Sequence, residues 1–129
     1  MPIRYETDGA IATITIDNGR LSIMQPEMHK EMHRVLESFT ADDAVHVGIM
    51  KGADGCSFCA GDDLKWKAED PSNRTMLERQ LSRAQRRSDP PARPGWDQEI
   101  LRMERFKPII AAVDGYALGQ GFMVLTHLT

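Results

Sequence analysis

The chain closes with the stretch that decides its fold, Gly115-Tyr-Ala-Leu-Gly-Gln-Gly-Phe-Met-Val-Leu-Thr-His-Leu-Thr129. The apolar segment from Ile109 to Val113 leads into this stretch and predicts a buried strand. After the glycine-rich turn, the apolar run from Gly119 to Leu128 predicts a short helix. Glycines at a strand-to-helix turn allow backbone N–H groups to face a bound anion at the start of the helix. This stretch therefore predicts a turn of a kind that can bind an anion.

A second turn of the same kind occurs earlier, in Phe58-Cys-Ala-Gly-Asp-Asp-Leu-Lys65. Either turn alone is more often structural than functional, and the common nucleotide motifs do not fit. The turn from Gly115 to Gly121 lacks the Lys-Ser/Thr pair of a P-loop, and Val124 stands where a dinucleotide fingerprint has its third glycine. Two such turns together could direct two N–H donors at one oxygen atom, which is how proteins stabilise an enolate or an oxyanion.

Length and composition indicate a single globular domain. The chain has 129 residues, of which 41% are hydrophobic and 27% are charged, and these values are typical of a folded soluble domain. No apolar run is long enough for a membrane helix. The first residues lack the apolar core of a signal peptide, so we expect a cytoplasmic protein. The net charge of −3 and the absence of aromatic residues interleaved with the basic ones argue against nucleic acid as a partner.

Positive charge is concentrated between Arg74 and Lys107, where nine basic residues accompany five acidic ones. The net charge of this segment is +4, which leaves −7 for the rest of a chain whose total is −3. Such a segment is usually a solvated helical face with paired charges; the alternative is a local attraction for phosphate groups. The polar stretch from Glu69 to Trp96, which overlaps this segment, predicts a charged helix followed by a mobile, irregular loop.

Metal and redox chemistry find little support in the sequence. Cys56 and Cys59 form a Cys-x-x-Cys pair, but a zinc site would need two further ligands. His29 and His33 could share a helix face, yet their order differs from the His-Glu-x-x-His of metalloproteases. We expect small buried thiols and no metal, and keep a redox or zinc module as a remote alternative.

The spacing of apolar residues predicts an α/β order. Alternation and short apolar runs predict four strands before the one at Ile109, with a hairpin at Asp8-Gly9: Ile3–Thr7, Ile11–Ile16, His46–Lys51 and the short Ser57–Ala60. Pro26 suits the first turn of a helix, whose Met-rich apolar stripe we interpret as core packing. A second helix is predicted from Asp97 to Phe106, ahead of Pro108. Adjacent strands with crossover helices follow from this order.

Beyond these patterns, the chain resembles a known family. The segment Phe58–Lys65, followed by Ile109–Gly121, closely resembles the paired motifs of the enoyl-CoA hydratase/isomerase (crotonase) family. Ile11–Ile16 and Ala41–Gly52 also look like the N-terminal half of that family. The resemblance covers the whole chain, and Glu69 to Trp96 is the least similar part.

The resemblance implies a crotonase-like spiral of ββα units, assembled into trimers or pairs of trimers. It implies an acyl-CoA thioester as substrate, without a separate cofactor, whose carbonyl oxygen accepts two backbone N–H groups. By position, these donors fall on Asp62 and Gln120, and the helix from Gly119 supports the second one. The residues that the resemblance assigns to the CoA and acyl channel are Arg20, Ser22, Ala60, Gly61, Asp63, Leu64, Lys65 and Gly119. Lys67 and the Arg-rich segment are further candidates for the CoA phosphates, and Trp66 is expected to pack.

Three departures from the family pattern limit the prediction of function. Met123 stands where hydratases of the family carry a glutamate, and a thioether cannot transfer a proton. Gln120 replaces the middle glycine, and the Asp62 carboxylate must turn away from the carbonyl to avoid opposing its charge. The sequence also reaches only the midpoint of the family, so we expect residues 1–129 to be an incomplete domain, the N-terminal CoA-binding half.

These departures leave two functions open. The first is the CoA-binding portion of an acyl-CoA-transforming enzyme that stabilises a thioester enolate, with isomerase, hydrolase, lyase or decarboxylase chemistry favoured over hydration. His127 and Asp114 are local candidates for its proton-transfer group. The second is a non-catalytic or truncated family member that acts as a scaffold or assembly partner, so the sequence leaves open whether the chain is part of an enzyme.

Overall fold

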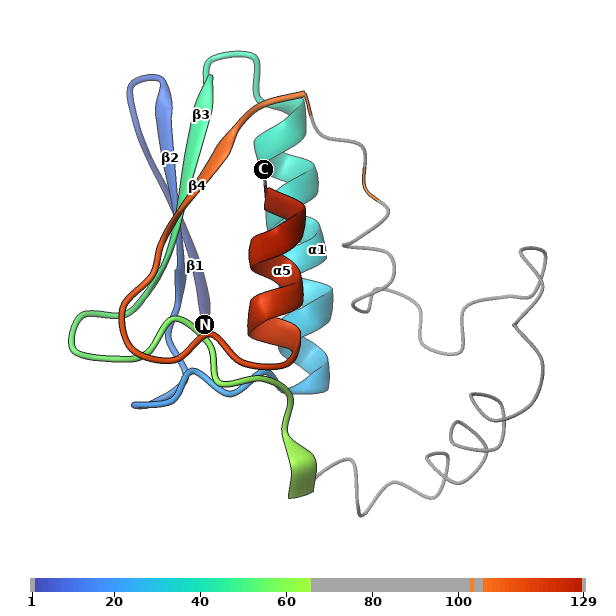
Figure 1. The fold of residues 1–129 in the computed structure, drawn as a ribbon. Coiled ribbons are helices and arrows are strands. Elements are labelled where there is room, and N and C mark those ends of the chain that lie inside the picture. Colours follow the sequence, from blue (N-terminus) through green and yellow to red (C-terminus); the bar gives the residue numbers. More distant parts are fainter. Residues whose placement is uncertain (1, 66–102, 104–105, 129) are drawn as a thin grey trace, which may run out of the picture.

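The computed structural model describes residues 2–65, 103 and 106–128. The charged segment predicted at 69–96 lies outside the described residues, and so does most of the helix predicted at 97–106. Lys67 and Trp66 also lie outside them. The fold described below therefore joins two parts of the chain, one on each side of that segment (Figure 1).

A four-stranded sheet forms one layer, in the order β1-β2-β3-β4. β1 (Ile3–Asp8) and β2 (Ile11–Ile16) are antiparallel, as the predicted hairpin requires. β3 (Val47–Gly52) runs parallel to β2, and β4 (Ile109–Ala112) runs parallel to β3. The parallel pairs require crossover connections, and α1 is the connection between β2 and β3. The α/β prediction is therefore confirmed.

Two helices form the second layer, and both lie on the same face of the sheet (Figure 1). α1 (Pro26–Ala41) begins at the predicted proline, and its stripe of Met28, Met32, Leu36 and Phe39 is buried, which confirms the interpretation as core. α5 (Gln120–Leu128) begins within the second glycine turn, as predicted. The core between the layers also contains Ile14, Met50 and Phe58, each 0% exposed.

The C-terminal end of α1 is bound by a lysine from the distant part of the chain. Lys107 Nζ donates to the carbonyl oxygen of Phe39 at 2.8 Å and to that of Asp42. The last carbonyls of a helix lack intrahelical partners and carry the negative end of its dipole, so a cation is favourable there. Lys107, the last cation of the basic segment, therefore caps α1.

The short strand predicted at Ser57–Ala60 is not a regular strand. Only an isolated parallel bridge forms there, between Cys59 and Ala117. The segment is extended and hydrogen-bonded to both neighbouring segments, but the bonds do not form a continuous ladder. The prediction of a strand was wrong, because an apolar pattern does not show whether the backbone groups of a segment form a continuous ladder.

The strand at Ile109 is less buried than its sequence predicts. Ile109 is buried, whereas Ile110 is 60% exposed and Val113 is 48% exposed. β4 is an edge strand of the sheet, and among the described residues only one of its faces is covered. α5 behaves similarly, because Val124 is buried and Phe122 is 58% exposed. Exposed apolar residues therefore gather on β4 and α5.

Candidate functional site

The start of the first glycine turn, residues 57–60, lies between residues 20–21 and residues 116–118 and is hydrogen-bonded to both. This arrangement brings the two predicted turns together. On one side, the backbone N–H of Ser57 donates to Arg20 O at 2.8 Å, and that of Ala60 donates to Leu21 O at 2.9 Å. On the other side, Cys59 N–H donates to Tyr116 O at 2.9 Å and Leu118 N–H donates to Cys59 O at 3.0 Å. Both turns lie at the end of the sheet opposite the β1–β2 hairpin (Figure 1).

The two turns contact each other through backbone atoms, and glycine is required at the contact. Gly61 has φ +106°, and a Cβ there would lie 3.1 Å from Leu118 O and 3.9 Å from the Gln120 nitrogen. A Cβ on Gly121 would lie only 2.3 Å from Cys59 O. Side chains at either position would push the turns apart, so the glycines allow the two backbones to approach closely.

Hydrogen bonds fix the direction of the first amide, the backbone N–H of Asp62. The Gly61 carbonyl accepts from Met24 N–H at 2.8 Å, and Asp63 N–H donates to Met24 O at 2.9 Å, so Asp62 is bracketed by Met24. In a trans peptide the C=O and the following N–H point in opposite directions. The Asp62 N–H therefore points away from Met24.

The direction of the second amide, the backbone N–H of Gln120, is set by α5. The Gly119 carbonyl accepts from Met123 N–H at 3.0 Å, which aligns that carbonyl with the helix. The N–H of the same peptide belongs to Gln120 and points out of the helix N-terminus, where N–H groups lack intrahelical acceptors and carry the positive end of the dipole. Sequence reasoning placed these two donors on Asp62 and Gln120, and the fold brings their turns into contact.

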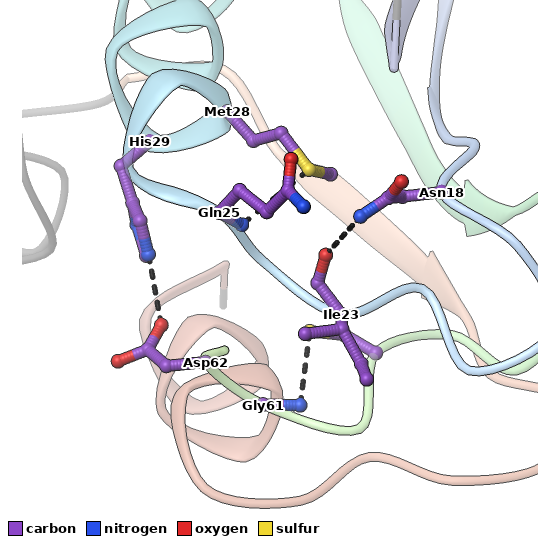
Figure 2. Close-up of polar contacts among 8 residues, drawn as sticks. Asn18, Ile23, Gln25, Met28, His29, Gly61 and Asp62 are labelled. Atoms are coloured by element: carbon purple, nitrogen blue, oxygen red, sulfur yellow. Dashed lines mark hydrogen bonds and ion pairs between the residues drawn. The ribbon is translucent and has the colours of Figure 1, made fainter. Parts of the chain in front are cut away.

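The side chain of Asp62 turns to α1 (Figure 2). His29 Nε2 and Asp62 Oδ1 are 2.8 Å apart, and the two side chains are 1% and 10% exposed. The sequence predicted that this carboxylate turns away from the carbonyl, but it missed the partner. A signal was present: His29 lies three residues before Met32 and seven before Leu36, so it lies beside the buried stripe of α1.

The remaining predicted site residues divide into buried and exposed ones. Ser22 is 0% exposed and has φ +48°; its hydroxyl donates to Ser57 O at 2.7 Å, so the side chain holds two loops together. Asp63 accepts from Lys65 N–H at 3.0 Å and caps the helical turn that begins at Leu64. Arg20, Leu64 and Lys65 are exposed, and Ala60 is half-buried.

The side chain of Gln120 is directed into the protein. The residue is 5% exposed, and its Nε2 has no hydrogen-bond partner among the residues that the structure describes. Met123, one helical turn further, is 42% exposed. The two departures from the family pattern on α5 thus differ in environment, because one is buried beside the first turn and the other faces outward.

The two cysteines are free and differ in exposure. Cys59 is buried, as expected, whereas Cys56 is only half-buried, which corrects the expectation of two buried thiols. Burial raises the pKa of the Cys59 thiol, and its sulfur accepts a weak hydrogen bond from Gly61 N–H at 3.4 Å. In the described ranges, no group of three or more His, Cys, Asp or Glu residues is arranged to hold a metal ion. The contact from Gly61 N–H links the Cys59 sulfur to the first turn.

A surface hollow of about 350 Å³ lies beyond the ends of β3 and β4. Residues 51–56 and 112–114 line it, and none of them is a predicted donor or CoA-channel residue. Asp114, a predicted candidate for proton transfer, belongs to this hollow. The side chain of the other candidate, His127, is outside the described part of the chain. No helix among the described residues is long and apolar enough to cross a membrane.

Comparison with known proteins identifies the family of this chain. The family model for enoyl-CoA hydratase/isomerase matches residues 6–127. The chain is 28% identical to (E)-benzylidenesuccinyl-CoA hydratase of Thauera aromatica, over 96% of this chain and 43% of the relative. It is 32% identical to carnitinyl-CoA dehydratase of Proteus mirabilis, over 93% of this chain and 41% of the relative. The chain thus spans less than half the length of these relatives.

Solved structures give the same fold. An enoyl-CoA hydratase/carnithine racemase from Magnetospirillum magneticum superposes with a TM-score of 0.74, over 99% of this chain and 44% of that one, at 21% identity. This likeness confirms the predicted crotonase-like fold. Because the family model covers nearly the whole sequence, the chain belongs to the enoyl-CoA hydratase/isomerase family.

Proposed function

We propose that this chain is the N-terminal, CoA-binding half of an acyl-CoA-transforming enzyme, in which the N–H groups of Asp62 and Gln120 stabilise a thioester enolate. The observation that carries the proposal is the backbone contact between the two turns, where a Cβ on Gly61 would lie 3.9 Å from the Gln120 nitrogen. The directions of the two peptide groups, fixed by Met24 and by α5, support the same proposal.

The chemistry requires donors that are in place before charge develops. When a proton leaves the carbon next to a thioester carbonyl, negative charge moves onto the carbonyl oxygen. Fixed N–H groups meet this charge without reorganising, and the loss of one such donor typically lowers kcat by about 10²–10³. The positive end of α5 adds a favourable interaction with the same charge.

Exposed basic side chains near the first turn would bind the CoA phosphates. Arg20 belongs to the segment that pairs with the first turn, and Lys65 follows the capping residue Asp63. Both side chains are exposed, as a contact with a mobile, highly charged ligand requires. We assign Ala60, Gly61, Leu64 and Gly119 to the acyl channel.

The reaction type is proposed from Met123. Two relatives carry the names hydratase and dehydratase and act on CoA thioesters. In this chain a methionine replaces the glutamate that the resemblance assigns to proton transfer, so we favour isomerase, hydrolase, lyase or decarboxylase chemistry. The proton-transfer group then belongs to a residue other than Met123.

The same methionine favours a second candidate function, a non-catalytic family member that acts as a scaffold. Under either function we propose that residues 1–129 form part of a larger domain, because apolar residues of β4 and α5 are exposed. We also propose assembly as a trimer or hexamer and a cytoplasmic location.

Calorimetric titration of the whole protein with acetyl-CoA and crotonyl-CoA tests the shared element, which is thioester binding. We expect binding in the micromolar to millimolar range and weaker binding of free CoA, because only the thioester has the carbonyl. No heat at millimolar thioester would contradict the proposal.

Turnover of a panel of acyl-CoA thioesters separates the enzyme from the scaffold. We expect turnover of at least one thioester, with the loss of most activity in Asp62→Pro, because proline has no N–H to donate. Asp62→Ala keeps the N–H and is the matched control. Thioester binding without turnover of any panel member would favour the scaffold.

A further inference from the structure

We propose that His29 is a positioning residue for the first oxyanion donor: its ring holds the Asp62 carboxylate against α1 and keeps this negative charge away from the thioester oxygen. The inference rests on the proposed function, because it assigns a role at the same site. It begins from the buried pair of His29 Nε2 and Asp62 Oδ1, 2.8 Å apart (Figure 2).

Asp62 carries two groups with opposite effects on the proposed anion, its backbone N–H and its carboxylate. Its backbone N–H is a proposed donor to the developing anion, and its carboxylate carries a charge of the same sign as that anion. An aspartate side chain is short, so its rotamer decides how close the carboxylate comes to an oxygen that is bound at the residue's own N–H. Like charges in a site with little water repel strongly, so the direction of this side chain affects how well the N–H can act.

The backbone at Asp62 is already fixed, which leaves the side-chain rotamer as the remaining freedom. Met24 brackets the residue through Gly61 O and Asp63 N–H, at 2.8 and 2.9 Å. The His29 ring then fixes the rotamer. An ionised carboxylate only accepts hydrogen bonds, so the Nε2–H of His29 donates, and such charge-assisted bonds are the stronger kind.

α1 provides a rigid base for this ring. The helix has sixteen residues, and Met32 and Leu36, on the same side as His29, are buried in the core. His29 itself is only 1% exposed. The ring therefore has little room to follow a mobile carboxylate, and it is the carboxylate that is held.

A second histidine on α1 offers a matched control. His33 lies one turn further, has a side chain that is 23% exposed, and has Nδ1 at 3.7 Å from Glu37 Oε2 on the same helix. It has the same chemistry and the same helix as His29, and its pair with Glu37 lies within α1. A general effect of removing a helical histidine would appear at both positions.

The test compares turnover of the most reactive thioester by the whole protein and its variants. We expect His29→Leu to lower kcat about tenfold or more, which corresponds to about 1.4 kcal/mol per factor of ten, with KM changed less than about threefold. The loss of kcat should come only from losing the hydrogen bond to Asp62. His29→Gln, whose amide N–H can reach the carboxylate, should therefore recover most of kcat. His33→Leu should retain the activity of the unsubstituted protein.

A double-mutant comparison isolates the carboxylate. Asp62→Ala keeps the backbone N–H and removes the charge, so His29→Leu should cause no further loss of kcat in that background. Should His29→Leu fail to fold, His29→Asn replaces it, because its shorter amide does not reach Asp62. The inference is overturned if the leucine variant is as active as His33→Leu, or if the same loss of kcat occurs in both backgrounds. Absence of turnover by the unsubstituted protein would instead contradict the proposed function.

Discussion

The two glycine turns contact each other through their backbones, but they are held by different means. The first turn, Phe58–Lys65, depends on residues distant in sequence: Met24 brackets its backbone and His29 binds its side chain. The second turn leads directly into α5, and its amide is directed by the first helical hydrogen bond, from Met123 to Gly119. The first amide is therefore positioned by tertiary contacts and the second by a local helix.

This difference matters for how each donor can fail. A loop donor loses its direction when any distant support is removed, even when the loop sequence is intact. A helix donor keeps its direction as long as the helix forms and remains docked, because the helical hydrogen bonds recur with every turn. Substitutions should therefore distinguish support by distant residues from support by α5. Substitutions at the contact between the turns should have the largest effect.

The largest effect should come from Gly121→Ala, because this position joins the turns. A Cβ there would be 2.3 Å from Cys59 O, and a backbone atom cannot move aside as a side chain can. We expect the free energy of unfolding to fall by about 3 kcal/mol or more, at the upper end of overpacking effects. Urea denaturation measures it.

Gly9→Ala is the control for this prediction. Gly9 has φ +57° with no atom near its Cβ position, and it lies in the β1–β2 hairpin, far from the site. Only backbone strain of about 1–2 kcal/mol is expected there. Gly121 is not at positive φ, so its cost should come from the contact with Cys59 alone. A loss for Gly121→Ala no larger than that for Gly9→Ala would contradict the prediction.

Gly61→Ala should act on the first turn alone and reduce activity more than stability. The φ of +106° is unfavourable for alanine, and Leu118 O would lie 3.1 Å from its Cβ. The Asp62 N–H should shift from its direction, and kcat should fall by about 10²-fold, as for the loss of one donor. Steady-state kinetics with a thioester substrate measures this. Unchanged kcat in a folded variant would remove Asp62 from the site.

Val124→Ala should weaken the second turn through the docking of α5. Val124 is 6% exposed and belongs to the core, so losing two methyl groups should cost about 2 kcal/mol. We expect kcat to fall several-fold because α5 becomes less firmly docked. The matched variant is Phe122→Ala on the exposed side of the same helix, which should cost far less stability in the chain described here.

The smallest effect should follow Cys59→Ala, because a sulfur acceptor at 3.4 Å contributes little to the first turn. We expect kcat within about threefold of the unsubstituted protein. A larger loss would mean that the thiol takes part in the reaction, and would favour the alternative of a redox module. Steady-state kinetics of Cys56→Ala provides the control.

The same variant tests the effect of pH on stability. Burial raises the pKa of Cys59 in the folded state above its unfolded value of about 8.5. The folded state then holds the proton more strongly, so the contribution to stability is complete below that value and is lost as pH rises through the folded pKa. Between pH 8 and 10.5, the free energy of unfolding should fall more steeply for the unsubstituted protein than for Cys59→Ala. Parallel curves would contradict this.

Much of the fold could be predicted because the relevant signals are local. The alternation in Ile11–Ile16, the proline at the start of α1, the Met-rich stripe and the glycines before α5 each act within a few residues of themselves. The resemblance then indicated Asp62 and Gln120 as the two donors. The structure brings the two turns into contact at Gly61 and Gly121, and the role of the two amides stays a prediction. The charged segment at 69–96 and its candidate cations lie outside the described residues.

The sequence by itself determined the order of strands and helices, the glycines of both turns and the membership in one family, because side-chain periodicity and backbone freedom are encoded residue by residue. Only the tertiary structure decided that Met24 brackets Asp62, that His29 receives its carboxylate and that Lys107 caps α1. These contacts join residues that are more than thirty positions apart, as in the 33-residue separation of His29 and Asp62. No local pattern specifies such a pairing, since it depends on how the sheet and helices bring distant backbones together.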